Sequence, residues 1–182
     1  MIEIHGASGE LLENLHASLP LSEETCEASR WRIKRLFNRS TSALEQGARA
    51  LGYYHIKIEQ QLSFEGNCWQ ASFSIDAGQP VILQTVTIHI EGDAQQDTEF
   101  EKILEATPVR VGNQLHHGQY ETLKDQIENL ALDRGYFDGK FKQKSLKVDP
   151  RIDKASILLE YDSGERYRIG SLELQQETYD PW

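Results

Sequence analysis

The sequence repeats itself at a spacing of 86 residues, and this period restricts the architecture of the chain more than its composition does. Three pairs of segments share the spacing: 2–4 with 88–90, 86–88 with 172–174, and 76–78 with 162–164. A fourth pair, offset by 83 residues, consists of Leu51-Gly52-Tyr53-Tyr54 and Arg134-Gly135-Tyr136-Phe137. Because loops vary in length between copies of a unit, this drift is compatible with a true repeat. The pattern predicts one supersecondary unit that recurs in series.

The first unit has the predicted order strand, helix, helix, strand, strand. Residues 2–5 alternate between apolar and polar side chains, which is typical of a strand. Leucines at helical spacing in 11–19 predict a short helix, and an apolar stripe through 33–51 predicts a longer one. Gly52 fits the residue that follows the longer helix. The start of that helix is open, because Ser40-Thr41-Ser42 could cap or interrupt it.

Two strands follow on either side of a hairpin turn at Glu65-Gly66-Asn67. In 56–64 the apolar side chains fall on one face, with Gln60 as the exception, and in 69–75 they alternate without a break. Each strand therefore has one dry face and one wet face. This predicts a sheet that helices cover on a single side.

The second unit repeats this order, with a strand at 86–90, helices at 99–106 and 120–131, and strands at 141–148 and 157–161. The apolar positions change phase between Phe141 and Leu146, which predicts a β-bulge. A further strand-like segment at 167–175 predicts the start of a third unit.

We therefore expect an α+β fold of tandem domains, each β-α-α-β-β, with a three-stranded mixed sheet covered on one face by two helices. The expected boundaries are 1–79 for the first domain, 80–165 for the second, and 166–182 for the truncated first strand of a third. No signal peptide is evident, since Met1 leads directly into a strand, and we expect the natural chain to continue, at least at its C-terminus.

The net charge of the chain is −10, and its acidic residues are spread evenly along the sequence. Nucleic acid is not an expected partner, because a nucleic-acid-binding surface needs concentrated basic side chains. The excess of acidic residues also argues against binding of the chain as a whole to an anionic membrane surface. No apolar run approaches the roughly 20 residues that a transmembrane helix needs.

No pattern of residues indicates catalysis or metal binding. The only adjacent histidines, His116 and His117, lack a third ligand at metal spacing, and we interpret them as part of a solvated loop before a helix. Ser8 and Ser42 lack the context of a nucleophile elbow, and the carboxylates are scattered over predicted surface helices. No phosphate-binding loop or dinucleotide fingerprint occurs. We therefore predict neither an enzyme nor a cofactor.

The element order and two local motifs resemble the POTRA domains (polypeptide-transport-associated domains) of the Omp85 family. Gly52-Tyr53-Tyr54 and Gly135-Tyr136-Phe137 are similar to the exit of the second POTRA helix, and 162–170 resembles the segment that joins one POTRA domain to the next. The resemblance covers essentially the whole chain. It is greatest to the TamA branch, the outer-membrane subunit of the translocation and assembly module, with BamA-like and two-partner secretion transporters as alternatives.

The resemblance implies a location on the periplasmic face of the outer membrane of a Gram-negative cell, with a C-terminal barrel outside this chain. The implied partners are a TamB-like protein anchored in the inner membrane and unfolded outer-membrane protein clients such as autotransporters, bound by β-augmentation. One alternative is an adaptor for a lipid-transporting TamB-like partner. Another is a POTRA module of a secretion or cell-division protein without a barrel.

The family places the second strand of each unit at the edge of its sheet, where unpaired backbone groups can bind an extended polypeptide. The corresponding candidates for partner binding are His55, Lys57, Glu59 and Gln61 in the first unit and Lys140, Lys142 and Lys144 in the second. The three lysines alternate and are expected on one face. They either protect the edge from aggregation or form a docking strip for an acidic partner.

The remaining candidates are expected to be structural. Gly52 and Gly135 would end a helix, and the aromatic residues after them would pack between the helix end and the sheet: Tyr53, Tyr54, Tyr136 and Phe137. Direct contact of these aromatics with clients is the alternative. Gly78 and Gly164 belong to short turns between domains, which would limit the angle between units or act as hinges.

Cys26 and Cys68 are too few for a disulfide scaffold and lack metal spacing. Within the expected fold, the longer helix starts near the hairpin tip, so both cysteines would lie at one end of the first unit. In an oxidising periplasm, a disulfide and two free thiols are equally compatible with the sequence.

Overall fold

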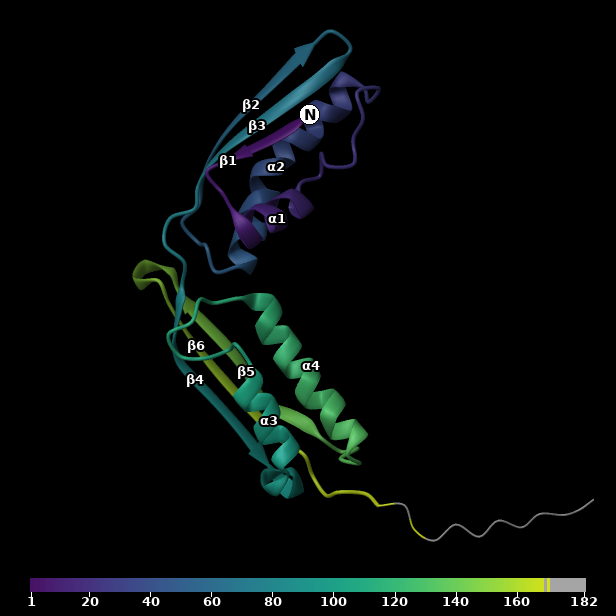
Figure 1. Ribbon diagram of the computed structural model, residues 1–182, viewed down its shortest axis with the longest axis vertical. Helices are drawn as coiled ribbons and strands as arrows, with labels where there is room; N and C mark the ends of the chain where they lie inside the picture. The colour runs from purple at the N-terminus through teal and green to yellow at the C-terminus, as the bar shows by residue number, and fades with distance from the viewer. Residues whose placement is uncertain (169, 171–182) are drawn as a thin grey trace, which may run out of the picture.

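The computed structural model describes residues 1–168 and 170, which fold into two units that lie end to end (Figure 1). The first unit comprises β1 (Ile2–His5), α1 (Gly9–Ser18), α2 (Arg30–Ala50), β2 (Lys57–Glu65) and β3 (Cys68–Asp76). The second comprises β4 (Ile82–Glu91), η1 (Gly92–Gln96), α3 (Thr98–Ala106), α4 (His117–Asp133), β5 (Lys140–Asp149), η2 (Pro150–Ile152) and β6 (Lys154–Asp162). Apart from the short 3-10 helices η1 and η2, the second unit repeats the order of the first.

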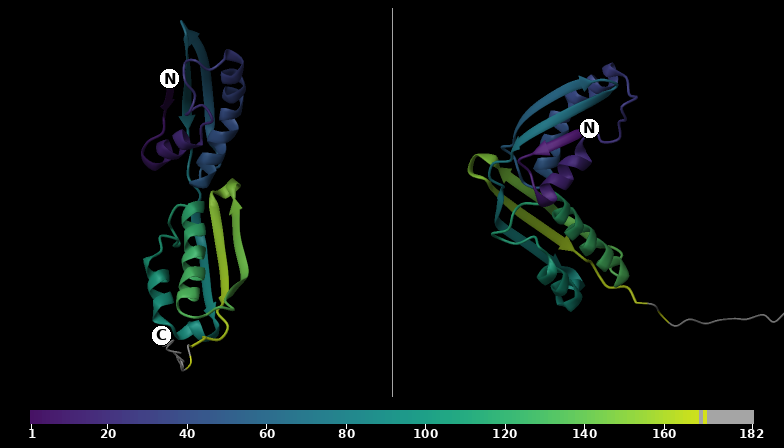
Figure 2. Two further views of the ribbon diagram at one scale, coloured as in Figure 1. Left: turned by 90° about the vertical axis from the view of Figure 1, so that its right-hand side faces the viewer. Right: turned by 45° about the horizontal axis from the view of Figure 1, so that its top comes forward.

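Both units contain a three-stranded mixed sheet with the same arrangement of strands. In the first, β3 is central, parallel to β1 and antiparallel to β2. In the second, β6 is central, parallel to β4 and antiparallel to β5. The two helices of each unit lie on one side of its sheet (Figure 2). The predicted α+β fold with tandem β-α-α-β-β units is confirmed.

The core of the first unit lies between its two helices and the dry face of its sheet. The central strand β3 alternates as the sequence does, and its buried side chains are Trp69, Ala71, Phe73 and Ile75. They pack against buried positions at helical spacing on α1 and α2: Leu11, Leu15, Ile33, Phe37, Leu44 and Ala48. Side chains repeat every two residues in a strand and every 3.6 residues in a helix, so the apolar side chains of each element fall on the face that meets the core.

The second unit has a separate core of the same construction. Its central strand β6 buries Ala155, Ile157, Leu159 and Tyr161, and α4 buries Tyr120, Leu123, Ile127 and Ala131. Val81 and Leu83, in the segment that enters the unit, belong to this second core. The buried residues of the two cores do not overlap, as expected for repeated units.

The longer helix of the first unit is continuous through the serine and threonine cluster whose role the sequence leaves open. The buried Ser40 hydroxyl donates to the Leu36 carbonyl oxygen at 3.1 Å, one turn earlier, and so remains satisfied inside the helix. The helix begins instead after Ser29, whose side chain accepts a hydrogen bond from the Arg32 N–H.

The predicted bulge in β5 is confirmed. The pairing of β5 with β6 shifts register between Phe141 and Gln143, which leaves Lys142 as the extra residue. Because side chains alternate along a strand, one extra residue moves every residue beyond the bulge to the face opposite to that expected from unbroken alternation.

The predicted strand of a third unit, 167–175, lies outside the described residues apart from Tyr167, Arg168 and Gly170. Among the described helices, none combines the length and the apolarity that crossing a bilayer requires.

Candidate partner-binding edges and the joint between units

The strands β2 and β5 form outer edges of their sheets. Each pairs with a central strand on one side only, which leaves the backbone N–H and C=O groups of the other side without a strand partner. They have 9 and 10 residues, whereas β1 on the opposite side of the first sheet has 4 and β4 on the opposite side of the second sheet has 10. The structure thus places both predicted second strands where an extended polypeptide can add to the sheet.

Three of the predicted β2 candidates lie on the open face of the first sheet. Lys57, Glu59 and Gln61 are exposed and alternate with the half-buried residues of the dry face. Lys57 lies opposite Asp76 in the ladder, with 3.8 Å between its Nζ and the carboxylate, and both side chains are largely exposed. Such an exposed pair contributes little stability, so the charged groups at this end of β2 remain free to interact with a partner.

His55 is not an edge residue, contrary to the prediction. The strand β2 begins at Lys57, and His55 lies in the preceding connection, where its Nε2 is 2.6 Å from the Pro150 carbonyl oxygen. The same nitrogen is 3.5 Å from the Asp153 carboxylate. His55 therefore contacts the second unit instead of lining the free edge of the first.

Gln60, the exception in the apolar pattern of β2, lies on the dry face opposite Phe73. Its Oε1 atom is buried and has no hydrogen-bond partner in the described part of the chain. A buried acceptor without a partner is destabilising, so this position carries a cost that an apolar residue would not.

The lysines of β5 do not share a face, and this prediction is wrong. Residues opposite each other in an antiparallel pair project to the same side of the sheet. Lys140 lies opposite Asp162, on the open face, whereas Lys144 lies opposite the core residue Leu159. The Lys144 ammonium is 5.3 Å from the centre of the Phe141 ring, which also faces the helices. The bulge at Lys142 causes this change of face.

Lys142 is occupied by carboxylates of its own unit. Its Nζ lies 2.8 Å from Glu91 of β4 and 2.9 Å from Asp162 of β6. The hydrogen bonds to Glu91 and Asp162 raise the pKa of Lys142 above its ordinary value. Of the three predicted lysines, Lys140 and Lys144 thus remain for a docking strip.

The two units are joined through the first Gly-Tyr-aromatic motif. The Val81 N–H donates to the Gly52 carbonyl at 2.9 Å, and the Gln114 side chain donates to the Leu51 carbonyl at 2.6 Å. Gly52 has φ +85°, and a Cβ atom there would lie 2.5 Å from the Leu115 carbonyl oxygen. Only glycine fits, because the position needs both a left-handed backbone and a close approach of the second unit.

Three of the chain's six histidines lie at this joint. The Tyr54 hydroxyl is 2.9 Å from His117 Nε2, and His116 Nε2 is 2.9 Å from the Glu10 carboxylate of α1. Together with His55, they connect the first unit to the second. The interpretation of His116 and His117 as a solvated loop is wrong, since His116 caps α4, His117 begins it, and both are half-buried.

Burial lowers the pKa of His117, with the nearby His116 adding to the effect and Glu121 opposing it. The neutral imidazole is therefore the form that fits the joint. Among the described residues, no group of three or more His, Cys, Asp or Glu side chains could hold a metal ion.

The aromatics of the two Gly-Tyr-aromatic motifs differ in what they contact. Tyr53 packs against the first core, whereas Tyr54 packs against the second. Tyr136 is buried, as predicted, but Phe137 is 62% exposed and lies beside the Tyr167 ring, with 5.7 Å between ring centres. The expectation that all four pack between a helix end and their own sheet holds for Tyr53 and Tyr136 and is wrong for Tyr54 and Phe137.

The second motif repeats the joint at the far end of the second unit. The Tyr167 N–H donates to the Gly135 carbonyl at 2.8 Å, as Val81 does to Gly52 86 positions earlier. Gly135 has φ +86°, and a Cβ atom there would lie 2.6 Å from the Tyr167 carbonyl oxygen. The segment that follows the second unit is therefore hydrogen-bonded to that unit in the same way as the segment that follows the first.

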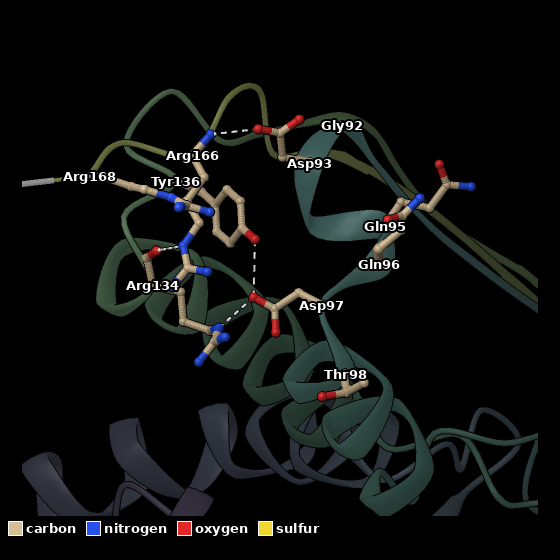
Figure 3. A pocket seen from close by; sticks show the side chains of 10 residues that line it. All are labelled: Gly92, Asp93, Gln95, Gln96, Asp97, Thr98, Arg134, Tyr136, Arg166 and Arg168. Carbon is tan, nitrogen blue, oxygen red and sulfur yellow. Dashed lines mark hydrogen bonds and ion pairs between the residues drawn. The ribbon is translucent and has the colours of Figure 1, made fainter.

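A polar cavity of about 500 Å³ adjoins this second corner (Figure 3). The Asp97 carboxylate accepts hydrogen bonds from Arg134 and from the Tyr136 hydroxyl, while the Arg166 side chain donates to the Arg134 carbonyl oxygen. Burial raises the pKa of Asp97, but the hydrogen bonds from Arg134, the Glu99 N–H and Tyr136 outweigh it, so the pKa is lowered overall. Arg168 also lines the cavity.

The two turns that contain Gly78 and Gly164 have the same local structure. Both glycines have positive φ, of +68° and +64°. The Gly78 N–H donates to the Asp76 side chain at 3.3 Å, and the Gly164 N–H donates to the Asp162 side chain at 3.0 Å. The turns are thus equivalent in conformation as well as in sequence.

Cys26 and Cys68 form a disulfide, with 4.4 Å between their Cα atoms. Cys26 precedes α2 and Cys68 opens β3 just after the hairpin tip, so the bond ties the start of the helix to the end of the sheet. The Trp69 indole N–H donates to the Thr25 carbonyl at 3.0 Å and supports the same connection.

Comparison with known families supports the interpretation of the first unit. Residues 1–77 match the family model described as POTRA domain TamA domain 1. The first unit is thus similar to a POTRA domain of the TamA type. The second unit repeats the order of elements and the arrangement of strands of the first.

Several solved structures of POTRA domains resemble the chain. One contains POTRA domains 3–5 of BamA from Haemophilus influenzae, with a TM-score of 0.47, 15% identity, and coverage of 91% of this chain and 65% of the BamA chain. Another is the N-terminal domain of Omp85 from Thermosynechococcus elongatus, with a TM-score of 0.39, 17% identity, and coverage of 88% and 60%. POTRA domains 1–2 of Omp85 from Anabaena have a TM-score of 0.37, 14% identity, and coverage of 90% and 93%.

Proposed function

We propose that this chain is a periplasmic scaffold of an outer-membrane assembly protein and that it binds extended polypeptides along β2 and β5. The strand order carries the proposal, since it leaves these two long strands as free edges. The second unit is a POTRA domain in this proposal, and neither unit is catalytic. The proposed location is the periplasmic face of a Gram-negative outer membrane.

An added strand would bind chiefly through backbone hydrogen bonds, which need no particular sequence. Such binding suits unfolded outer-membrane protein clients, whose sequences vary, and it also suits a TamB-like partner that offers an extended segment. The pattern of side chains on the sheet adds selectivity. On β2 the open face presents Lys57, Glu59 and Gln61 beside the free edge.

Site-specific photocrosslinking along the edge tests the proposal. A photoreactive residue at Gln61 of β2 is expected to capture an unfolded client or the TamB-like partner. Ser72 lies opposite Gln61 on the central strand, on the same face but one strand further from the edge, and serves as the control. Equal capture from both positions would contradict edge binding. Capture of the fixed partner without clients would favour the lipid-transport adaptor.

The lysines of β5 need a separate test. Replacement of Lys140 and Lys144 with glutamine is expected to weaken binding of an acidic partner if they form a docking strip. If the lysines only protect the edge, the variant keeps its affinity and aggregates more readily. Lys142→Gln is the comparison, since its charge is already used by Glu91 and Asp162.

We further propose that a third unit follows and docks at the second corner, with domain boundaries near 79 and 165. The repeated hydrogen bond at Gly135 supports this, as does Phe137, which holds in the second unit the place of Tyr54 in the first. Phe137→Trp fluorescence is expected to shift to the blue in a longer chain that contains the next unit. Leu132→Trp, at an exposed position of α4, is the control. An unchanged Phe137→Trp spectrum would contradict the proposal.

A further inference from the structure

The helix α2 carries a concentration of positive charge that polypeptide binding at the edges does not use. Residues 30–39 contain five of the chain's 19 lysines and arginines: Arg30, Arg32, Lys34, Arg35 and Arg39. The wider segment 28–44 contains no aspartate or glutamate. This occurs in a chain whose net charge is −10.

Most of these cations point away from the core. Trp31, Lys34, Arg35 and Arg39 are exposed, and helical geometry places them opposite the buried Ile33, Phe37, Ser40 and Leu44. We call these four exposed residues the basic-aromatic face. Trp31 is 69% exposed, and the Arg35 guanidinium lies 4.8 Å from the centre of its ring. Apart from Met1 at the chain end, Trp31 is the exposed large apolar residue among the described residues of the first domain.

The basic-aromatic face is available to a partner. Two neighbouring cations are engaged: Arg32 forms an ion pair with Glu24 at 2.6 Å, and Arg30 lies over the Phe64 ring at 5.1 Å. In the described part of the chain, Lys34, Arg35 and Arg39 form no ion pair within 4.0 Å. None of the three is therefore held in an ion pair, although the charge of Arg35 acts on the nearby Glu24.

The acidic residues of the first domain lie outside 28–44, and some of them are in the sheet while others are on or next to the helices: Glu10, Glu13, Glu23, Glu24, Glu27 and Glu45. Glu59 and Glu65 of β2 and Asp76 of β3 are exposed on the open face of the sheet, on the side away from the helices. The helical layer between the two faces is about 10 Å thick. This exceeds the screening length of about 8 Å at physiological ionic strength. The acidic residues of the open sheet face are thus too far away to neutralise the basic-aromatic face.

We propose that the basic-aromatic face of α2 docks on the surface of a membrane that contains anionic phospholipid. The guanidinium and ammonium groups would bind lipid phosphates, and the Trp31 indole would enter the headgroup layer, where indoles are favoured. The face is the convex side of a helix, which matches a broad surface better than a narrow segment of polypeptide. The cavity at the start of α2 is lined by Arg30 and Phe64, and none of the four residues of the face lines it.

Binding of the chain to lipid vesicles tests the proposal. The chain is expected to bind vesicles of phosphatidylcholine with phosphatidylglycerol and not vesicles of phosphatidylcholine alone, with an affinity that falls as salt rises. The triple variant Lys34→Gln, Arg35→Gln, Arg39→Gln is expected to lower the affinity roughly tenfold or more. The matched control, Lys102→Gln, Arg110→Gln, Lys147→Gln, removes the same charge from exposed positions of the second unit outside the candidate docking strip, and it is expected to bind like the original chain.

Trp31→Ala provides a second measurement that does not alter the charge. It is expected to weaken binding to anionic vesicles while the circular dichroism spectrum is retained, because the side chain is exposed. Absence of vesicle binding, or equal losses in the two triple variants, would overturn the proposal. Binding of the face to polyglutamate but not to vesicles would also overturn it, since the face would then serve an acidic polypeptide.

Discussion

The Tyr54 hydroxyl of the first unit and His117 Nε2 of the second lie 2.9 Å apart across the joint between the units. Both side chains are half-buried, and Tyr54 packs against the core of the second unit although it belongs to the first. The contact connects the end of α2 to the first residue of α4. The joint between the units therefore contains a titratable group.

Acidification is expected to loosen the joint. Burial lowers the pKa of His117 in the joined state below the value of 6.5 that it has when exposed. The stabilisation is complete above 6.5 and is lost as the pH falls through the lowered pKa, because the separated state binds the proton more readily. The pH dependence of the distance between fluorophores on the two units, measured by energy transfer, is the test.

The His117→Gln variant is expected to lose this pH dependence. The original chain should open as the pH falls, whereas the variant should keep the same distance between its units in acid and at neutral pH. An original chain whose joint is equally stable in acid and at neutral pH would contradict the argument.

Gly52→Ala is expected to destabilise the joint strongly. The added Cβ would meet the Leu115 carbonyl oxygen at 2.5 Å, and alanine is strained at φ +85°. We expect a loss of about 2–3 kcal/mol in the free energy of unfolding. Gly66→Ala is the control, because Gly66 also has positive φ but open space around it. Chemical denaturation should show a smaller loss there, of about 1 kcal/mol.

Removal of the disulfide is expected to weaken the first domain only. Cys26 and Cys68 are separated by 42 positions, and closing a loop of this size stabilises a fold by about 2–4 kcal/mol. The double variant Cys26→Ser, Cys68→Ser should lower the denaturant midpoint of the first domain by the corresponding amount. Reductant should have the same effect on the original chain and none on the variant. A midpoint that does not respond to reductant would contradict this expectation.

Gln60→Leu is expected to stabilise the first domain by about 1 kcal/mol. The substitution removes a buried amide oxygen that has no partner and adds apolar surface next to Phe73. Gln61→Leu, at the neighbouring exposed position, is expected to have little effect and serves as the control. Thermal unfolding of the two variants distinguishes them, and a loss of stability in Gln60→Leu would show that the amide is satisfied in solution.

Local sequence patterns predicted the secondary structure and the buried faces of both units, because side-chain periodicity acts over a few residues. The alternation in β3 and the stripe in α2 determine which faces are buried, and the phase change after Phe141 marks the bulge. The same phase change also predicts the face of each residue beyond the bulge. The bulge moves Lys144 to the helix side of the sheet, so the three lysines of β5 could not share one face as expected.

The contacts of the joint could not be read from the sequence. Tyr54, His116 and His117 are brought together by the way one unit ends and the next begins, over a separation of more than 60 positions. The repeat was the one sequence feature that pointed to these contacts. Tyr54 and Phe137 occupy equivalent positions in the two units, and Val81 and Tyr167 stand 86 positions apart. Aligning the two units predicts equivalent contacts but does not identify their partners.

The amino-acid sequence determined the unit, its order of elements and its repetition, because hydrophobic period and turn residues act over a few positions. The edge position of the second strand of each unit was implied by the resemblance to POTRA domains and not by these local patterns. Tertiary structure decided which side chains face a partner. It placed His55 in the joint and left Phe137 exposed. These outcomes depend on the distance through space between groups that are far apart in the sequence, which local patterns do not encode.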